Sequence, residues 1–515
     1  MLAKTYSAAV LGIDAYVIDV EVNATGEGEF SAVSLVGLPD AAVKESRDRV
    51  RSAIANSGYS QPGGLIVVNL APADIKKEGA AYDLPIALGI LASDGHLDRE
   101  LLATTAVIGE LALDGSVRPV RGALPIALEV AGKKHIKALL VPEANVGEAA
   151  LAAAGKVPVY PVNYLSEAID FFKGVPMLPV KAGIVDYFRE HHDPLRCPDF
   201  ADVKGQVMVK RALEIAATGG HNTLMIGPPG TGKSMLAMRL PGILPEMTLE
   251  ETLETSKIHS ILGLLSGGKP LLNARPFRSP HHTVSDAGLL GGGKNPLPGE
   301  ISLAHNGVLF LDELPEFKRN VLEVLRQPLE VGSVTVSRAA GSFVFPANFI
   351  LVAAMNPCPC GHYNNPKRQC RCSTSQITRY QSKISGPLLD RIDINVEVAQ
   401  LSENELMGAP TGESSATIRQ RVVAARKIQE ARLSPLGIRC NAQMGPKELQ
   451  AFCKLDSGNQ TLLRHAIQSY NLSARAYDRI LRVARTIADL GNAPEIGEEH
   501  LFEAINYRIL DKNYW

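Results

Sequence analysis

The sequence predicts an α/β chain built from more than one domain. At 515 residues it is too long to fold around a single hydrophobic core. Strand and helix candidates alternate through the first 175 residues and again on both sides of a glycine-rich loop near residue 230, whereas the chain from about Ser402 reads as helical. We therefore expect two α/β parts followed by a helical C-terminal part.

The N-terminal part shows clear strand and helix patterns but no obvious chemistry. Residues 16–22 alternate between apolar and polar types and predict a strand, as does the apolar run 65–70. Asp40 is placed to cap a helix that continues to Ser57, and residues 82–93 predict a second, largely apolar helix. Strands and helices that interleave in this way favour an α/β domain.

A glycine-rich loop between a strand candidate, 222–226, and a helix candidate, 235–240, carries the strongest functional signal. It fills every position of the phosphate-binding pattern G-x-x-x-x-G-K-[ST]. Its glycines allow backbone N–H groups to surround phosphates, while Lys233 would reach the β- and γ-phosphates and Ser234 would hold Mg²⁺. The loop consists of Gly227, Pro228, Pro229, Gly230, Thr231, Gly232, Lys233 and Ser234. It predicts a nucleotide site with ATP and Mg²⁺ as cofactors, and a plain glycine turn is the alternative.

Two further apolar runs end in polar residues that suit nucleotide hydrolysis. Residues 307–311 lead into Asp312 and Glu313, and residues 349–355 lead into Asn356. A strand would deliver Asp312 to the Mg²⁺ at the carboxyl edge of the sheet, where Glu313 can orient the attacking water. Asn356 is placed to touch the γ-phosphate or that water.

Arginines further along the chain are candidates for contact with phosphate charge. Arg391 follows a Pro-Leu-Leu turn and could project onto the nucleotide of a neighbouring subunit. The alternative is a surface ion pair with Asp390 or Asp393.

A predicted helix between Ser473 and Gly491 presents several arginines on one face. They are spaced by three or four residues, which places them together on a helix. This face consists of Arg475, Arg479, Arg482 and Arg485. We expect an anion-facing surface with Arg475 nearest the helix start, and a solvated charged face is the alternative.

Two segments carry basic residues on flexible backbone, which suits contact with DNA phosphates without sequence recognition. Residues 333–345 predict a β-hairpin with Arg338 near its tip. The other segment is rich in Gly and Pro and holds Arg275, Arg278, His281, His282 and Lys294. Both segments could instead be subunit contacts.

Four cysteines form two C-x-C pairs separated by nine residues: Cys358, Cys360, Cys370 and Cys372. Four thiolates could wrap a tetrahedral Zn²⁺, although the spacing is tighter than that of the usual C-x₂-C knuckle. Reduced, unligated cysteines are the alternative.

Charge and composition limit the function classes. The net charge of −1 excludes binding of a polyanion by bulk charge, so any contact with nucleic acid needs a local basic surface. The N-terminus resembles neither a signal peptide nor a membrane span, and the seven cysteines do not suggest a disulfide framework. We expect a cytoplasmic protein that does not contact membranes.

Two N-terminal segments, Lys77–Leu84 and Gly109–Gly122, resemble the protease domain of Lon. Active proteases of that type carry a serine and a lysine where this chain has Ala81 and Leu124, and neither side chain can attack a carbonyl or move a proton. The resemblance implies a Lon-protease-like fold (ribosomal S5 domain 2-like) without peptidase activity.

The motifs between Gly227 and Arg475 resemble, in their order, those of an AAA+ ATPase. The resemblance assigns Walker A to the glycine-rich loop, Walker B to Asp312 and Glu313, sensor 1 to Asn356, an arginine finger to Arg391 and sensor 2 to Arg475. The segments 277–283 and 299–307 look like the magnesium-chelatase branch.

With its Lon-like N-terminal part, the whole chain resembles the YifB/ComM family of magnesium-chelatase-like ATPases. That resemblance implies a homo-oligomeric ring, expected to be a hexamer, that hydrolyses ATP and moves on single-stranded or branched DNA. It implies a helicase that promotes branch migration during recombination of DNA taken up in natural transformation. The ATPase subunit of a metal chelatase and a protein-remodelling AAA+ chaperone are the competing functions.

The expected domain organisation follows from these features. Residues 1–175 form the Lon-like domain without its dyad, and 176–200 form a proline-containing linker. Residues 201–401 form the AAA+ core with its P-loop and the cysteines, and 402–515 form a helical lid that carries sensor 2.

Overall fold

The computed structural model describes most of the chain and divides it into two compact units. The described residues are 1–26, 31–77, 79–183, 197–265, 270–293, 296–338, 341–365, 368–407, 412–470 and 472–514. Unit 1 consists of Met1–His192 and Leu249–Asn273, and unit 2 of Asp193–Thr248 and Ala274–Trp515.

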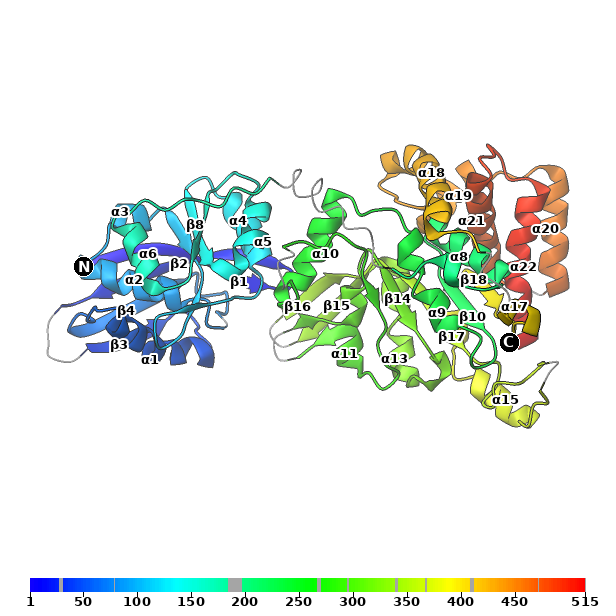
Figure 1. The fold of residues 1–515 in the computed structure, drawn as a ribbon, viewed down its shortest axis with the longest axis horizontal. Coiled ribbons are helices and arrows are strands. Elements are labelled where there is room, and N and C mark those ends of the chain that lie inside the picture. The colour runs from blue at the N-terminus through cyan, green and yellow to red at the C-terminus, as the bar shows by residue number, and fades with distance from the viewer. Residues whose placement is uncertain are drawn as a thin grey trace. The chain divides into compact units, whose positions relative to one another are not determined.

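Unit 1 is built on a mixed seven-stranded sheet with the strand order β3-β4-β2-β1-β5-β8-β9 (Figure 1). Its β1–β2 and β2–β4 pairs are antiparallel, and its other pairs are parallel. The strands are β1 (Leu2–Leu11), β2 (Asp14–Ala24), β3 (Ser31–Val36), β4 (Gly64–Ala71), β5 (Thr105–Val107), β8 (Ala138–Pro142) and β9 (Val159–Val162). A separate pair is formed by β6 (Glu110–Leu111) and β7 (Val117–Arg118).

Helices cover both faces of this sheet because successive strand residues point to opposite sides. Ile18 of β2 packs in one apolar cluster with residues of α1, α2 and α6, whereas Ala8 of β1 packs in another with residues of α4 and α5. The helices are α1 (Ala41–Asn56), α2 (Asp83–Ser93), α3 (Arg99–Leu102), α4 (Ala123–Ala131), α5 (Val146–Ala153) and α6 (Leu165–Phe172).

The local predictions for this part of the chain are confirmed. The two expected strands lie within β2 and β4, and the two expected helices are α1 and α2. Asp40 caps α1, with its carboxylate accepting a hydrogen bond from the amide of Val43 at 2.8 Å. The mixed α/β class of this unit is therefore established, while the Lon-like assignment stays a prediction.

One helix of unit 1 comes from the middle of the chain. Helix α10 (Leu249–Ile261) contacts α4, and its Ser260 hydroxyl donates to Glu148 at 2.7 Å while accepting from the amide of Leu124 at 3.3 Å. This segment lies within the stretch 201–401 that the sequence assigned to the nucleotide-binding core.

Unit 2 is built on a five-stranded sheet with the order β11-β14-β17-β10-β18, in which every pair is parallel. The strands are β10 (Thr223–Ile226), β11 (Phe277–Arg278), β14 (Val308–Leu311), β17 (Ile350–Met355) and β18 (Ile394–Glu397). Parallel strands that are buried on both sides read as continuous apolar runs, which is how β10, β14 and β17 were predicted. All three predictions are confirmed.

Helices lie before and between these strands in the chain. They are α8 (Val207–Gly219), α9 (Lys233–Ala237), α11 (Asp286–Leu290), α12 (Glu300–Leu303), α13 (Arg319–Glu323), α14 (Arg326–Val331), α15 (Thr374–Gln381) and α16 (Gly386–Leu389). A short ribbon joins β12 (Gly291–Gly292) to β13 (Leu297–Pro298). The predicted hairpin also forms, with β15 (Ser333–Arg338) antiparallel to β16 (Gly341–Pro346) and Arg338 opposite Gly341.

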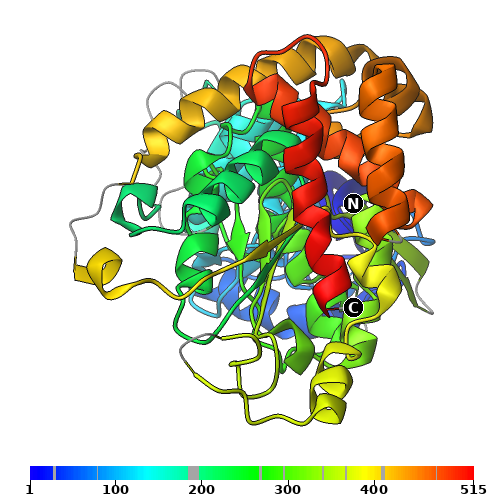
Figure 2. The same cartoon turned by 90° about the vertical axis from the view of Figure 1, so that its right-hand side faces the viewer.

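The C-terminal part is helical, as expected. It contains α17 (Glu403–Met407), α18 (Ser415–Leu433), α19 (Pro446–Phe452), α20 (Ser457–Tyr470), α21 (Ala474–Leu490) and α22 (Glu498–Tyr514). Figure 2 shows the red α22 beside the orange helices of this region, and α22 also contacts β18. The side chain of Ser473 caps α21, which ends at Gly491. In the described part of the chain, no helix combines the length and apolarity needed to cross a bilayer.

A buried ion pair joins α1 to α2 in unit 1. Arg49 donates to both oxygens of Asp83, at 2.7 and 3.1 Å, and the Asp83 side chain is fully buried. Burial raises the pKa of Asp83 to about 6, while the hydrogen bond and charge of Arg49 oppose that shift. Removing one partner of such a pair leaves an uncompensated buried charge.

We expect Arg49→Ala to lower the free energy of local unfolding of α1 and α2 by ~3 kcal/mol at pH 8. The loss should shrink at pH 5, because a carboxyl with a raised pKa is neutral below that pKa and its unpaired charge then disappears. Hydrogen exchange of the α1 and α2 amides at the two pH values measures this. Arg51→Ala, an exposed position on the same helix, is the control, and an equal loss at both pH values would contradict the prediction.

Candidate nucleotide-binding site

The glycine-rich loop joins β10 to α9. Gly227 must lack a side chain, because a Cβ there would lie 2.4 Å from the carbonyl oxygen of Val398. Gly230 and Gly232 adopt φ values of +78° and +87°, which L side chains rarely adopt. The turn therefore depends on these glycines, as the phosphate-binding pattern requires.

Lys233 is folded back onto this loop. Its Nζ donates to the carbonyls of Gly227 and Pro228 at 2.6 and 2.9 Å, and to Asn356 Oδ1 at 3.2 Å. Burial lowers the pKa of Lys233 to about 8, although the charges of Asp312 and Glu313 act in the opposite direction. The lysine thus joins the loop to the end of β17.

The two side chains expected to hold Mg²⁺ lie together. The hydroxyl of Ser234 donates to Asp312 Oδ2 at 2.5 Å, and the other carboxylate oxygen of Asp312 accepts from the amide of Glu313 at 2.9 Å. Asp312 follows β14 directly. A hydroxyl and a carboxylate are oxygen ligands of the kind that Mg²⁺ prefers, so these residues fit the ion.

Glu313 has an unexpected neighbour. His282 Nδ1 lies 3.5 Å from Glu313 Oε2, and the rings of His281 and His282 lie 4.0 Å apart between centroids. The sequence grouped His282 with the DNA-contact candidates. Because β11 pairs in parallel with β14, residues that follow β11 reach the same sheet edge as Glu313. The shortness of β11 hid this from the sequence pattern.

Arg391 and Arg475 lie near each other, each in a salt bridge. Arg391 donates to Glu330 at 2.6 Å and to the carbonyl of Pro387 at 2.6 Å, and Arg475 pairs with Asp390 at 3.1 Å. The partner of Arg391 is thus Glu330 rather than the two aspartates considered from the sequence. Among the described residues, neither arginine forms a hydrogen bond with the glycine-rich loop or with Asn356.

The expected anion-facing arginine surface on α21 is wrong for three of its four members. Arg479 donates to the carbonyl of Ile392 at 3.0 Å, and Arg482 donates to that of Met444 at 2.9 Å. Arg485 is buried and pairs with Asp489. These guanidinium groups satisfy carbonyl and carboxylate groups inside the protein, and only Arg475, whose side chain is 63% exposed, remains at the surface.

Two of the basic residues predicted to contact DNA, Arg275 and Arg278, form hydrogen bonds within unit 2. Arg275 donates to the carbonyls of Pro245, Glu246 and Asn306, and Arg278 forms a two-bond pair with Glu300 at 2.7 Å. Both therefore have structural partners in unit 2.

The remaining candidates lie at the surface or outside the described residues. His281 and Arg338 are exposed. The guanidinium of Arg338 lies against Gly292, at 3.0 Å from the point where a Cβ of that glycine would stand. The two segments that the sequence treated separately thus meet at this contact. Lys294 lies outside the described residues.

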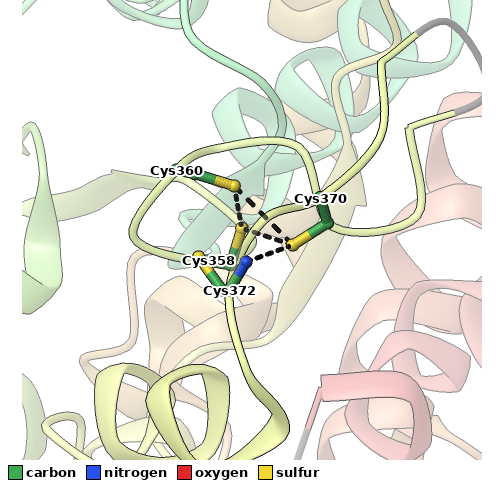
Figure 3. Close-up of side chains that lie close together, drawn as sticks. All are labelled: Cys358, Cys360, Cys370 and Cys372. Atoms are coloured by element: carbon green, nitrogen blue, oxygen red, sulfur yellow. Dashed lines mark hydrogen bonds between the residues drawn. The ribbon is translucent and has the colours of Figure 1, made fainter.

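The four clustered cysteines converge at one point. Their sulfur atoms all lie within 4.8 Å of one another, in a loop that follows Asn356 (Figure 3). The structure therefore brings together all four ligands that the sequence proposed for a metal ion.

Comparison with known proteins decides the family. Three family models match: magnesium chelatase subunit ChlI over residues 199–406, subunit ChlI of Mg-chelatase over 20–145, and the ChlI C-terminal model over 412–508. The chain is 45% identical to competence protein ComM of Haemophilus influenzae over 513 residues, which covers 99% of this chain and 98% of that protein. It is 44% identical to YifB of Salmonella typhimurium over 514 residues, with the same coverage. The chain belongs to the YifB/ComM family of magnesium-chelatase-like ATPases.

A chelatase relative matches far less of the chain. The magnesium-chelatase 67 kDa subunit of Chlorobaculum parvum is 30% identical over 162 residues, which is 31% of this chain and 23% of that subunit. Similarity to the YifB/ComM family, by contrast, extends through both units. The family assignment implies ATP and Mg²⁺ as cofactors, and the site described above has residues that fit both.

Lys233 predicts a pH dependence of nucleotide binding. Phosphates beside Nζ favour its charged form, so binding should raise a pKa that is about 8 in the free protein. Affinity for ATP should then be constant below pH 8 and fall as the pH rises above it, by up to about tenfold per pH unit.

Titration with a fluorescent ATP analogue from pH 7 to 9.5 measures this effect. Calorimetry in two buffers of different ionisation enthalpy should show close to one proton taken up on binding at pH 9 and only a small fraction of a proton at pH 7. An affinity that stays constant to pH 9.5 would contradict the assignment of Lys233 to the phosphates.

Proposed function

We propose that this chain is an AAA+ motor that hydrolyses ATP and acts on DNA as a branch-migration helicase. The observation that carries the ATPase part is the meeting of Ser234, Asp312 and the Lys233–Asn356 pair at one edge of a parallel sheet. These are the groups that nucleotide hydrolysis needs, delivered from three neighbouring strands.

Each side chain has a definite part in the proposed reaction. Lys233 exchanges its loop carbonyls for phosphate oxygens when ATP binds. Ser234 and Asp312 would hold Mg²⁺, which neutralises charge on the phosphates. Glu313 orients the attacking water and accepts its proton. Asn356 accepts a hydrogen bond from Lys233 and positions that lysine beside the γ-phosphate.

We further propose that the chain works as a ring, with a hexamer as the expected form. Among the described residues, Arg391 forms hydrogen bonds with Pro387 and Glu330 and none with the glycine-rich loop of its own chain. This supports an action on the nucleotide of a neighbouring subunit. There it would stabilise the charge that develops on the transferred phosphoryl group. Arg475 is the proposed sensor 2.

DNA is the proposed substrate because the relative named for competence is similar along nearly its whole length. A surface of suitable chemistry supports this, since the exposed Arg338 of the β15–β16 hairpin lies against the glycine loop at Gly292. Unit 1 is proposed to be Lon-like and without peptidase activity, with Ala81 and Leu124 at the positions of the dyad.

Dissociation of a synthetic four-way DNA junction tests the whole proposal. The wild-type protein should separate the junction with ATP, and Lys233→Ala should abolish both that activity and ATP hydrolysis. ATPase activity stimulated by unfolded protein but not by branched DNA would favour a protein-remodelling function. A chelatase function would be favoured if DNA left the ATPase activity unchanged and the other chelatase subunits raised it.

Glu313→Gln should separate binding from hydrolysis. We expect unchanged affinity for ATP and a loss of turnover by roughly 10²–10³-fold, because the amide cannot accept a proton from water. Steady-state phosphate release and binding of a fluorescent ATP analogue measure the two effects. The control is Glu316→Gln, an exposed acid three residues away that pairs with Lys383, and equal turnover in the two variants would contradict the role of Glu313.

Arg338→Ala should weaken DNA binding and leave basal ATP hydrolysis unchanged. Loss of one phosphate contact should also lower the slope of log affinity against log salt by about one. Anisotropy titrations at several salt concentrations measure this, with Arg464→Ala, an exposed arginine of α20, as control. DNA affinity equal to that of the wild type would reject the hairpin as a contact.

A further inference from the structure

The loop after β17 holds four cysteine sulfurs in a compact group. Cys358 Sγ lies 3.4 Å from Cys360 Sγ and 3.7 Å from Cys370 Sγ, and the last two lie 3.6 Å apart (Figure 3). None of these cysteines is in a disulfide. A tetrahedron of sulfurs at about 2.3 Å from a central Zn²⁺ has edges of about 3.8 Å. The spacing therefore suits one central ion.

One backbone amide is directed at a sulfur of this group. The amide of Cys372 donates to Cys370 Sγ at 3.4 Å, within the second C-x-C pair (Figure 3). The thiolate is the form of cysteine that binds metal, and an N–H donor suits that form.

The chain reaches this arrangement through left-handed residues. Gly361 has φ of +78° and Asn364 has φ of +57°. These turns fold the first C-x-C pair back toward the second. The tight spacing, which made a metal site doubtful from the pattern alone, is thus compatible with convergence of all four sulfurs.

No apolar core holds this loop. Of the described residues between Cys358 and Ser373, only Cys358 and Gly361 are buried. A segment that buries so little needs another source of stability, and a metal cross-link is the usual one in small cysteine-rich loops. Four protein ligands leave no open position, which is the property of a structural rather than a catalytic zinc site.

The same loop touches the nucleotide site. A Cβ on Gly361 would lie 2.5 Å from Pro229 Cδ, so the backbone of Gly361 lies directly against the ring of Pro229. Pro229 belongs to the glycine-rich loop, and Pro357, directly after Asn356, accepts a hydrogen bond from Gln381 of α15 at 3.1 Å. The cysteine loop is thereby packed between the phosphate loop and α15.

We propose that Cys358, Cys360, Cys370 and Cys372 bind one Zn²⁺ ion and that this zinc loop supports the phosphate loop through the Gly361–Pro229 contact. The metal site is independent of the proposed action on DNA. Its support of the phosphate loop rests on the proposed nucleotide site, and both parts are tested without DNA.

Metal content tests the site. Protein purified without a His-tag should contain one zinc per chain by plasma mass spectrometry, and an organomercurial should release it to a colorimetric dye. Cys360→Ser and Cys372→Ser should lose the metal, while Cys197→Ser, a cysteine outside the group, should keep it. Substoichiometric metal in the wild type, or iron with visible absorption, would overturn the zinc assignment.

Gly361→Ala tests the support of the phosphate loop. The added methyl displaces Pro229, so the variant should keep its zinc but bind a fluorescent ATP analogue roughly tenfold more weakly. Gly437→Ala is the matched control, since Gly437 also has positive φ, +71°, but no atom within 4 Å of its Cβ position. Equal nucleotide affinity in the two variants would overturn the support, whereas loss of binding in both the wild type and the variants would count against the nucleotide site itself.

Discussion

The constraint on which this protein depends is the parallel order of the sheet in unit 2. Since parallel strands end at a common edge, residues far apart in sequence are forced together there. Lys233 and Asn356 are separated by 123 positions, and Ser234 and Asp312 by 78, yet both pairs are within hydrogen-bond distance. The neighbours β14, β17 and β10 supply all four residues. Any change that shifted one of these strands would separate groups that act together in the proposed reaction.

Features that depend on a few consecutive residues were predictable from the sequence. Asp40 and Ser473 were identified as helix caps because the bonds they make reach only three residues along the chain. The core strands were identifiable because burial on both faces requires uninterrupted apolar runs. The glycine-rich loop was identifiable because its backbone conformation restricts the residue types it accepts.

Partners of charged side chains were not predictable, since they lie on distant elements. Arg391 is paired with Glu330, 61 positions away, and Arg479 donates to carbonyls about 90 positions away. Helical spacing predicts that the arginines of α21 share one face, but it carries no information about what covers that face. His282 beside Glu313 was missed for a similar reason, because only the pairing of β11 with β14 brings them together.

Membership of α10 in unit 1 was hidden by its composition. Its buried residues include Thr252, Thr255 and Ser256, so the buried face shows no apolar stripe that a sequence pattern would detect. Two of these hydroxyls have partners: Thr255 donates to the carbonyl of Glu251 at 2.7 Å, and Ser256 accepts from the amide of Leu272 at 2.9 Å. Because α10 belongs to unit 1, the chain crosses between the two units three times.

Strand β17 connects the hairpin of the proposed DNA contact to Asn356 at the proposed nucleotide site. It is buried along its whole length between β14 and β10, so it can move only with the sheet. The hairpin with Arg338 precedes it, and Asn356 and the cysteine loop follow it. At its entry, the amide of Asn306 donates to the carbonyl of Asn348 at 2.7 Å, which ties the start of β17 to the residues before β14. One buried strand therefore lies between the hairpin of the proposed DNA contact and Asn356, which accepts a hydrogen bond from Lys233 at 3.2 Å.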